Sequence, residues 1–235
     1  MFKYRAINKY SIDSLVKGSI YFAAPDKLND PFDCKVDVRK SVSNAERYSC
    51  ACKSKKLMDL LNNQAFFDKF KLKISEVGIC SFSLELKSVL MWSHYADEHK
   101  GMAILYEFPE VFLNEGKFIG TVKVRYKENS LTNWFIKKAN QLPMNSDDLG
   151  VELAKKYFAS KSPDWGYEKE VRIIRPKQGP FIIKKDFIKQ ICFGLNTPDE
   201  DIDLIKAIVA HYKHKVDLCR MVRTDSDFGL DVKKI

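Results

Sequence analysis

Two glutamates and an arginine occupy alternate positions in the stretch Trp165-Gly166-Tyr167-Glu168-Lys169-Glu170-Val171-Arg172. Residues 167–174 are predicted as a strand, and a strand directs positions two apart to the same face. Glu168, Glu170 and Arg172 should therefore form one row. Like-charge repulsion should raise the pKa of one carboxyl, while Arg172 should lower the pKa of its neighbour. Spacing alone favours a solvated strand face with internal ion pairs over a reactive pair.

The segments on both sides of this stretch alternate between predicted strands and helices. The chain opens as strand, helix, strand, and Gly18 is expected to end the first helix. Thr197-Pro198-Asp199-Glu200 predicts a helix start, with Thr197 as N-cap. This mixture indicates an α+β fold. Further strands are predicted at 2–5, 19–23, 78–83, 102–108, 118–126, 181–183, 188–193, 215–222 and 228–232, and helices at 11–17, 88–99, 132–139, 146–160 and 198–211.

The composition fits one globular domain that spans residues 1–235. Forty-five per cent of the residues are hydrophobic, and 16 Phe with 10 Tyr supply large side chains for a core. No repeat, low-complexity linker or change in composition divides the chain. Residues 43–73 are predicted as two lysine-rich helices, so we expect a helical insertion at about 43–75.

The apolar pattern predicts a cytoplasmic protein without a membrane span. No stretch approaches the roughly 18 uninterrupted apolar residues of a membrane helix, and Met1-Phe2-Lys3-Tyr4-Arg5 lacks the apolar run of a signal peptide. The six cysteines are scattered and are expected to be free thiols. Cys50 and Cys52 are the only close pair, and neither a second pair nor a nearby His completes a zinc site.

The net charge of +9 favours contact with phosphate or other anions. Lysines are spread along the chain, however, and do not form a basic tail. The charge therefore agrees with nucleic-acid binding without establishing it.

Residues 88–99 combine aromatic and polar side chains on one predicted helix. His94 should face Asp97 and Glu98 at helical spacing, and Tyr95 should face His99. Metal binding is disfavoured because no His-x-x-x-His or Glu-x-x-His pair is present. The pattern favours Val89, Trp92 and Ala96 in the core with a charged outer face. It leaves open whether Trp92, His94 and Tyr95 contact a ligand.

Two other segments carry polar groups. Asn29-Asp30-Pro31-Phe32-Asp33 is typical of a turn capped by its own side chains, although its compactness would also suit a ligand. Ser81 and Ser83 alternate on a predicted strand, where one hydroxyl could face a ligand or both could be ordinary small residues.

These segments together resemble a widespread prokaryotic family of domains of unknown function. The resemblance spans nearly the whole chain and names no activity. It rests on Tyr4-Arg5, Ile20-Tyr21-Phe22, Asn29-Asp30-Pro31-Phe32-Asp33, Cys80-Ser81-Phe82-Ser83, Met91-Trp92-Ser93-His94-Tyr95-Ala96, Tyr167-Glu168-Lys169-Glu170-Val171-Arg172 and Phe193-Gly194-Leu195.

The order of an arginine on the first strand, a serine on a middle strand and a glutamate on a late strand also resembles the ADP-ribosyltransferase superfamily. Arg5, Ser81 or Ser83, and Glu170 take these places, and Glu168-Lys169-Glu170 is similar to the Glu-x-Glu element of some of those transferases. The resemblance implies a mixed or antiparallel split β-sheet core with peripheral helices.

The resemblance to the ADP-ribosyltransferase superfamily also implies that NAD is the substrate, and it implies a role for each candidate residue. Glu170 would stabilise the oxocarbenium-like ribose electrostatically, with Glu168 as its helper. Arg5 would bind phosphate or ribose, and Ser81 would support the nicotinamide ribose. Tyr21, Trp92 or Tyr95 would stack on a ring of the ligand. The remaining candidates for ligand binding are Ser83 and His94.

The same resemblance implies a toxin or phage-defence effector that modifies nucleic acid or protein. A neutralising partner and the oligomeric state are left open. Two alternatives stand beside the transferase. One is a nucleic-acid binding module without catalysis, suggested by the charge and the interspersed aromatics. The other is a metal-dependent phosphoesterase or nuclease, which requires Asp30, Asp33, His94 and Asp97 to meet in space.

Overall fold

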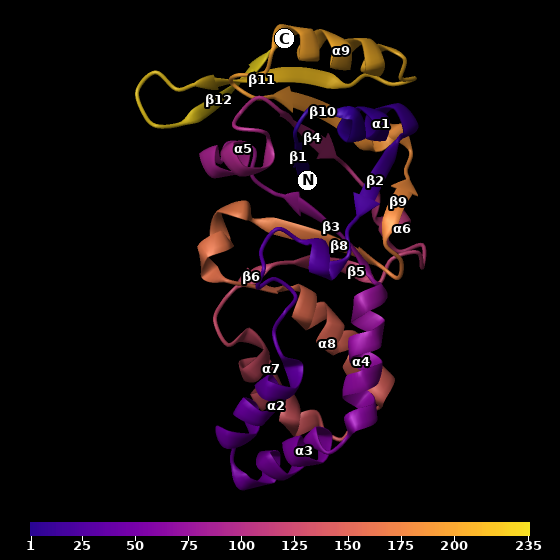
Figure 1. Cartoon of the computed structure of the whole chain (residues 1–235), viewed down its shortest axis with the longest axis vertical. Coiled ribbons are helices and arrows are strands. Elements are labelled where there is room, and N and C mark those ends of the chain that lie inside the picture. The colour runs from indigo at the N-terminus through magenta and orange to yellow at the C-terminus, as the bar shows by residue number, and fades with distance from the viewer.

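A computed structural model describes residues 1–235 as an α+β fold with an eight-stranded sheet of mixed orientation (Figure 1). Two short sheets flank it: β2 (Ser19–Phe22) pairs with β9 (Gly179–Ile182), and β6 (Arg125–Tyr126) pairs with β7 (Ser160–Lys161). In spatial order the main sheet contains β12 (Leu230–Lys234), β11 (Asp217–Arg223), β10 (Ile188–Phe193), β4 (Met102–Tyr106), β1 (Phe2–Arg5), β3 (Gly78–Ser83), β8 (Glu170–Arg175) and β5 (Gly120–Lys123).

The main sheet divides into two halves between β1 and β3. These strands share a single residue pair, Phe2 with Ser83, whereas β3 and β8 are paired from Gly78 with Arg175 to Ser83 with Glu170. Within the main sheet, all pairings are antiparallel except that of β10 with β11. Because β1 and β3 separate after one pair, side chains from both strands can line the space between them.

The strand–helix–strand opening follows local sequence signals. Helix α1 (Lys9–Lys17) begins with Asn8, whose side chain accepts from the backbone N–H groups of Tyr10 and Ser11. Gly18 ends the helix in the left-handed conformation, as expected, at φ 65°. The helix starts two residues earlier than its apolar spacing indicated because the Asn8 cap precedes that spacing.

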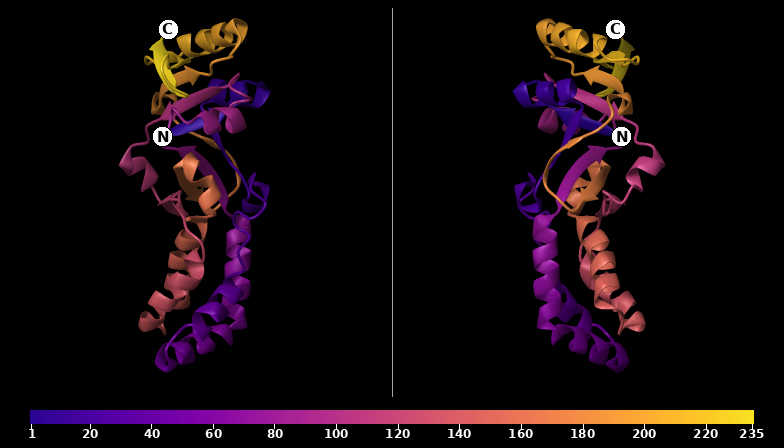
Figure 2. Two further views of the ribbon diagram at one scale, coloured as in Figure 1. Left: turned by 90° about the vertical axis from the view of Figure 1, so that its left-hand side faces the viewer. Right: turned by 90° about the vertical axis from the view of Figure 1, so that its right-hand side faces the viewer.

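A helical lobe extends from the sheet beside β8 and β5 (Figures 1 and 2). Its core contains Val42, Leu57, Phe70 and Phe135, and continues onto β8 through Ile174. The insertion contains three helices and not the expected two, since the chain turns again at Asn62-Asn63. The lobe consists of α2 (Val38–Arg47), α3 (Ala51–Leu61), α4 (Gln64–Glu76), α7 (Ser130–Lys138) and α8 (Ser146–Phe158).

The other helices cover the β10–β4–β1 half of the sheet. Helices α1 and α9 (Asp199–Ala210) pack on one face through Leu15 and Ile205, and α5 (Val89–Tyr95) packs on the other through Trp92. Helix α9 lacks the predicted Thr197 cap, because that hydroxyl donates to the Gly101 carbonyl at 2.9 Å. The remaining helices are α6 (Glu110–Leu113) and the 3-10 turns η1 (Pro25–Lys27), η2 (Ala139–Gln141), η3 (Pro163–Glu168) and η4 (Lys185–Phe187).

Three predicted elements are divided or end well before their predicted boundary. The segment 118–126 divides into β5 and β6, which join different sheets. The segment 167–174 divides because Lys169 takes φ 44°, so that Glu168 ends η3 and Glu170 begins β8. Helix α5 stops at Tyr95, and three consecutive residues with positive φ, Asp97 to His99, follow it. The helical pairs of His94 with Glu98 and of Tyr95 with His99 are therefore not formed.

Candidate functional site

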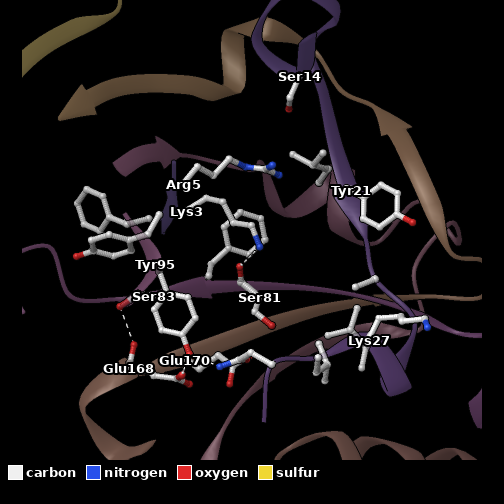
Figure 3. Close-up of a pocket in the computed structure, with 18 of the residues that line it drawn as sticks. Lys3, Arg5, Ser14, Tyr21, Lys27, Ser81, Ser83, Tyr95, Glu168 and Glu170 are labelled. Atoms are coloured by element: carbon white, nitrogen blue, oxygen red, sulfur yellow. Dashed lines mark hydrogen bonds between the residues drawn. The ribbon is translucent and has the colours of Figure 1, made fainter. Parts of the chain in front are cut away.

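A cavity of about 670 Å³ lies where β1 and β3 separate (Figure 3). Its walls come from both halves of the sheet, the β2 region, the loop after η1, and η3. The sequence-predicted site residues that line it are Arg5, Tyr21, Ser81, Ser83, Tyr95, Glu168 and Glu170.

One end of the cavity is formed by a buried ionic cluster, defined as Asp33, Lys161, Glu168, Glu170 and Arg172. The Arg172 guanidinium donates to Glu170 at 2.8 and 2.9 Å and to Asp33 Oδ1 at 3.0 Å. The Lys161 ammonium lies 2.5 Å from Glu168, 3.3 Å from Glu170 and 3.6 Å from Asp33. When all five groups are ionised, three carboxylates face two cations, so one net negative charge remains at this end.

The local backbone conformation explains which of these side chains lie where strand spacing predicted them. Glu170 and Arg172 share one face of β8, as their spacing predicted. Glu168 is not part of that row, because the left-handed Lys169 separates it from the strand. The solvated face favoured by spacing alone is also wrong: Glu168, Glu170 and Arg172 are 4%, 5% and 0% exposed. The helical lobe and the loop containing Asp33 cover this face of β8.

The two glutamates differ in pKa, as their spacing predicted. Burial raises the pKa of Glu168, against the opposing effects of Lys161 and Tyr95, and repulsion from Glu170 is only a minor cause. Burial also disfavours the charge on Glu170, but Arg172 and Lys161 outweigh it and lower the pKa of Glu170 to about 2. Glu170 therefore stays ionised at neutral pH, while Glu168 is better suited to accept a proton.

Because the pKa of Glu170 is lowered and that of Glu168 is raised, the two groups change the free energy of unfolding with pH in opposite directions. A carboxyl with a lowered pKa contributes stability above its unfolded pKa, about 4.3 for Glu, and loses that contribution as pH falls toward its folded value. The difference in free energy of unfolding between wild type and Glu170→Gln should therefore narrow by about 3 kcal/mol between about pH 5 and pH 2. Urea denaturation of both proteins at several pH values measures it.

Glu168 acts in the opposite direction, because a raised pKa favours the folded state most at low pH and less as pH rises above about 4.3. Most of this contribution cancels in the difference between the two proteins, because repulsion from Glu170 is only a minor cause of the raised pKa of Glu168. Glu76→Gln, at the exposed end of α4, is the matched control, because it also replaces a glutamate by glutamine but outside the ionic cluster. A difference for Glu170→Gln that does not change with pH would contradict the assigned pKa of Glu170.

The opposite end of the cavity is cationic. Lys3 Nζ donates to the Ser81 carbonyl at 2.7 Å, and burial lowers the pKa of Lys3. Arg5 forms no ion pair and donates no hydrogen bond, and its buried Nε has no partner. Figure 3 shows the Arg5 side chain extending into the cavity near Lys3 and Ser81. A half-buried guanidinium without a carboxylate is suited to an anionic ligand.

The hydroxyl groups near the acidic end differ in the hydrogen bonds that they form within the protein. Ser83 donates to the Glu168 carbonyl at 2.6 Å and accepts from the Glu85 backbone N–H at 3.0 Å. Tyr95 donates to Glu168 Oε1 at 2.5 Å and accepts from Asn29 Nδ2 at 2.7 Å. Ser81 donates no hydrogen bond to a backbone carbonyl and lies beside Glu170, whose pKa it helps to lower. Ser83 thus positions Glu168, while the Ser81 hydroxyl faces Glu170 within the cavity.

Two predicted ligand contacts are wrong. Trp92 is fully buried, its Nε1 donates to the Leu86 carbonyl at 2.7 Å, and its ring packs edge-on against Tyr4. His94 is exposed on the outer side of α5, with its ring 6.1 Å from that of Tyr167, and does not line the cavity. Tyr21 lies at the rim and is 56% exposed.

The lining residues that the sequence did not single out include Lys3 and Lys161, and it identified Asn29 only within a turn that would also suit a ligand. Lys3 lies two positions before Arg5 on β1, so strand spacing could have identified it. The segment 29–33 is both a capped turn and part of the site. Asp30 accepts from the Phe32 backbone N–H at 2.9 Å, as expected of a turn, while Asn29 and Asp33 contact Tyr95 and Arg172.

No group of three or more His, Cys, Asp or Glu side chains is placed to hold a metal ion. Of the residues required by the phosphoesterase alternative, Asp33 is bound to Arg172, whereas His94 and Asp97 are exposed. The grouping on which that alternative depends is therefore not formed. All six cysteines are free, as expected.

Fold and site together define a mixed α/β protein with a charged cavity between the halves of a split sheet. Residues 91–173 match the model of a family described as a protein of unknown function (DUF2971). The match agrees with the resemblance to a family of unknown function, but spans less of the chain than that resemblance predicted. No curated protein and no solved structure matches the chain. None of the helices combines the length and apolar character needed to cross a membrane.

Proposed function

We propose that this protein is an ADP-ribosyltransferase-like enzyme that uses NAD as substrate and transfers ADP-ribose to an acceptor. The supporting observation is that Arg5, Ser81 and Glu170 line one cavity, although they lie on β1, β3 and β8. Its volume of about 670 Å³ is within the range of sites that enclose cofactors. The cationic and acidic ends match a ligand that carries a pyrophosphate and, at some distance, a cationic nicotinamide ribosyl group.

In this proposal Arg5 and Lys3 bind the pyrophosphate. The sequence has no glycine-rich loop, whose backbone N–H groups hold phosphates in many nucleotide-binding proteins. Side-chain cations take that role here, and Arg5 offers a planar set of donors suited to phosphate oxygens. Ser81, between the two ends, supports the nicotinamide ribose, and Tyr21 at the rim stacks on a ring of the ligand.

The reaction breaks the bond between ribose C1′ and the nicotinamide nitrogen. The bonding electrons leave with nicotinamide, which becomes neutral, and positive charge develops on the ribose. The Glu170 carboxylate stabilises that charge, because Arg172 fixes its orientation and its low pKa keeps it ionised. An acceptor then forms the new bond to C1′ and releases a proton. Glu168 accepts this proton, since burial raises its pKa.

Arg5→Gln tests the phosphate end of this proposal. Loss of a charge-assisted contact to phosphate is worth about 1.5–3 kcal/mol, so NAD should bind about 10- to 100-fold more weakly. Titration calorimetry with wild type and variant measures this. The fold should be unaffected, because Arg5 has no partner to lose.

Arg47→Gln is the matched control, since Arg47 is an exposed arginine without an ion pair on α2. It should bind NAD like the wild type. Equal NAD affinity of the Arg5 variant and wild type would remove Arg5 from the site. Absence of any saturable NAD binding by the wild type would reject the proposal as a whole.

A further inference from the structure

Four cations gather where the helical lobe meets β6, and none of them lines the cavity. Arg125, Lys127, Lys137 and Lys156 form no ion pair, and we call them the cationic surface. Other lysines of the lobe do have carboxylate partners, such as Lys138 with Glu152 at 2.5 Å. The cationic surface therefore does not reflect a general lack of acidic groups in this part of the molecule.

Backbone contacts bring the elements of this surface together. Arg125 on β6 pairs with Ser160 on β7, and the Arg125 N–H donates to the Ala159 carbonyl at 2.6 Å. The Ser160 hydroxyl donates to the Lys156 carbonyl at 2.8 Å and is hydrogen-bonded to the Ser130 hydroxyl, with 3.1 Å between the two oxygens. The end of α8, the start of α7 and β6 thus meet at Ser160, as Figure 1 lets the reader follow.

The cations are close enough to affect one another. Burial lowers the pKa of Lys156, and the charges of Arg125, Lys127 and Lys137 lower it further. Lys137 and Lys156 lie in the last turns of α7 and α8, where a helix dipole favours positive charge. The dipole does not explain Arg125 and Lys127, which lie outside both helices. Their mutual repulsion costs stability unless an anionic partner offsets it.

A groove of about 490 Å³ adjoins this surface at Lys127. It contains few apolar side chains. Besides Lys127, its charged lining consists of the cations Lys40 and Lys161 and the carboxylates of Asp30, Asp33, Asp37 and Glu128. Hydroxyl groups line much of it, from Ser41, Ser130, Thr132, Ser160 and Ser162. Hydroxyls and cations are the groups with which proteins contact the sugar–phosphate backbone, whereas an apolar partner would find little to bury.

We propose that the cationic surface, together with the hydroxyls of Ser130 and Ser160 beside it, binds the sugar–phosphate backbone of a nucleic acid without reading its sequence. This inference does not depend on NAD cleavage, because no residue of the cationic surface lines the cavity. If the transferase proposal also holds, the surface identifies nucleic acid as the class of acceptor.

The test compares two double variants in binding a fluorescein-labelled single-stranded oligonucleotide, once as DNA and once as RNA, by fluorescence anisotropy. Arg125→Gln/Lys156→Gln removes two cations of the surface. Lys189→Gln/Lys213→Gln removes two exposed lysines without ion pairs from the distant β10–α9 region and is the charge-matched control. Neutralising mutually repelling cations should leave the melting temperature unchanged or raise it, so a loss of binding is not a loss of fold.

With four backbone contacts, the wild-type affinity should fall with salt at a logarithmic slope of about −3, which is roughly 50-fold between about 50 and 200 mM salt. The Arg125/Lys156 variant should halve this slope, and the control should keep it. The proposal is overturned if the wild type does not bind, if the variant binds like the wild type, or if both variants weaken equally. Equal results with DNA and RNA assign the contact to phosphate, and binding of RNA alone assigns part of it to the 2′-hydroxyl.

Discussion

Arg172→Met is expected to lower the free energy of unfolding by about 3–5 kcal/mol, a large share of the roughly 5–15 kcal/mol that typical proteins possess. Arg172 is fully buried and donates to both Glu170 and Asp33. Methionine fills similar space but leaves these carboxylates short of their main counter-charge in the interior. Urea denaturation followed by circular dichroism measures the change.

A second readout separates this cause from a general packing defect. Unpaired buried carboxylates have raised pKa values, so the variant should recover part of its lost stability as pH falls from about 7 to 5. Arg175→Met is the control on the same strand, because Arg175 packs on the Phe181 ring and has no carboxylate partner. Equal losses for both variants, or a loss at Arg172 that does not change with pH, would contradict the role assigned to Arg172.

Glu170→Gln is expected to lower the turnover of NAD by about 10²- to 10³-fold, the effect of removing one electrostatic contact made in the transition state. NAD binding should change much less, since the substrate carries little of that charge before the bond breaks. The measurement combines the rate of nicotinamide release, followed by liquid chromatography, with NAD affinity from calorimetry.

Two controls keep this result interpretable. Near-ultraviolet circular dichroism shows whether the amide at position 170 preserves the packing around Arg172. Glu170→Asp keeps the charge but withdraws the carboxylate by one methylene, so it should retain more of the fold and still lose turnover. Unchanged turnover in a folded Glu170→Gln protein would exclude Glu170 as the stabilising group.

Local signals in the sequence predicted those parts of the fold and site that depend on neighbouring residues. Gly18 ends α1, and alternation on β8 places Glu170 and Arg172 on one face. The split of pKa between Glu168 and Glu170 was also predicted, although burial and not mutual repulsion is the main reason for the raised pKa of Glu168.

Contacts between distant segments could not be predicted in this way. Asp33 and Arg172 are 139 positions apart, and nothing in either segment identifies the other. Lys161 precedes η3 in a stretch without a motif, yet its ammonium contacts three carboxylates. Trp92 resembled a ligand-stacking residue because helical spacing cannot distinguish a fully buried ring from one at the rim of a cavity.

The most direct test of the central claim is the release of nicotinamide from NAD by the wild-type protein, measured with DNA, RNA or cell extract as acceptor. The proposal predicts release that saturates with NAD and is lost in Glu170→Gln, together with ADP-ribose on the acceptor detected by mass spectrometry. No release with any acceptor, combined with no saturable NAD binding, would contradict it.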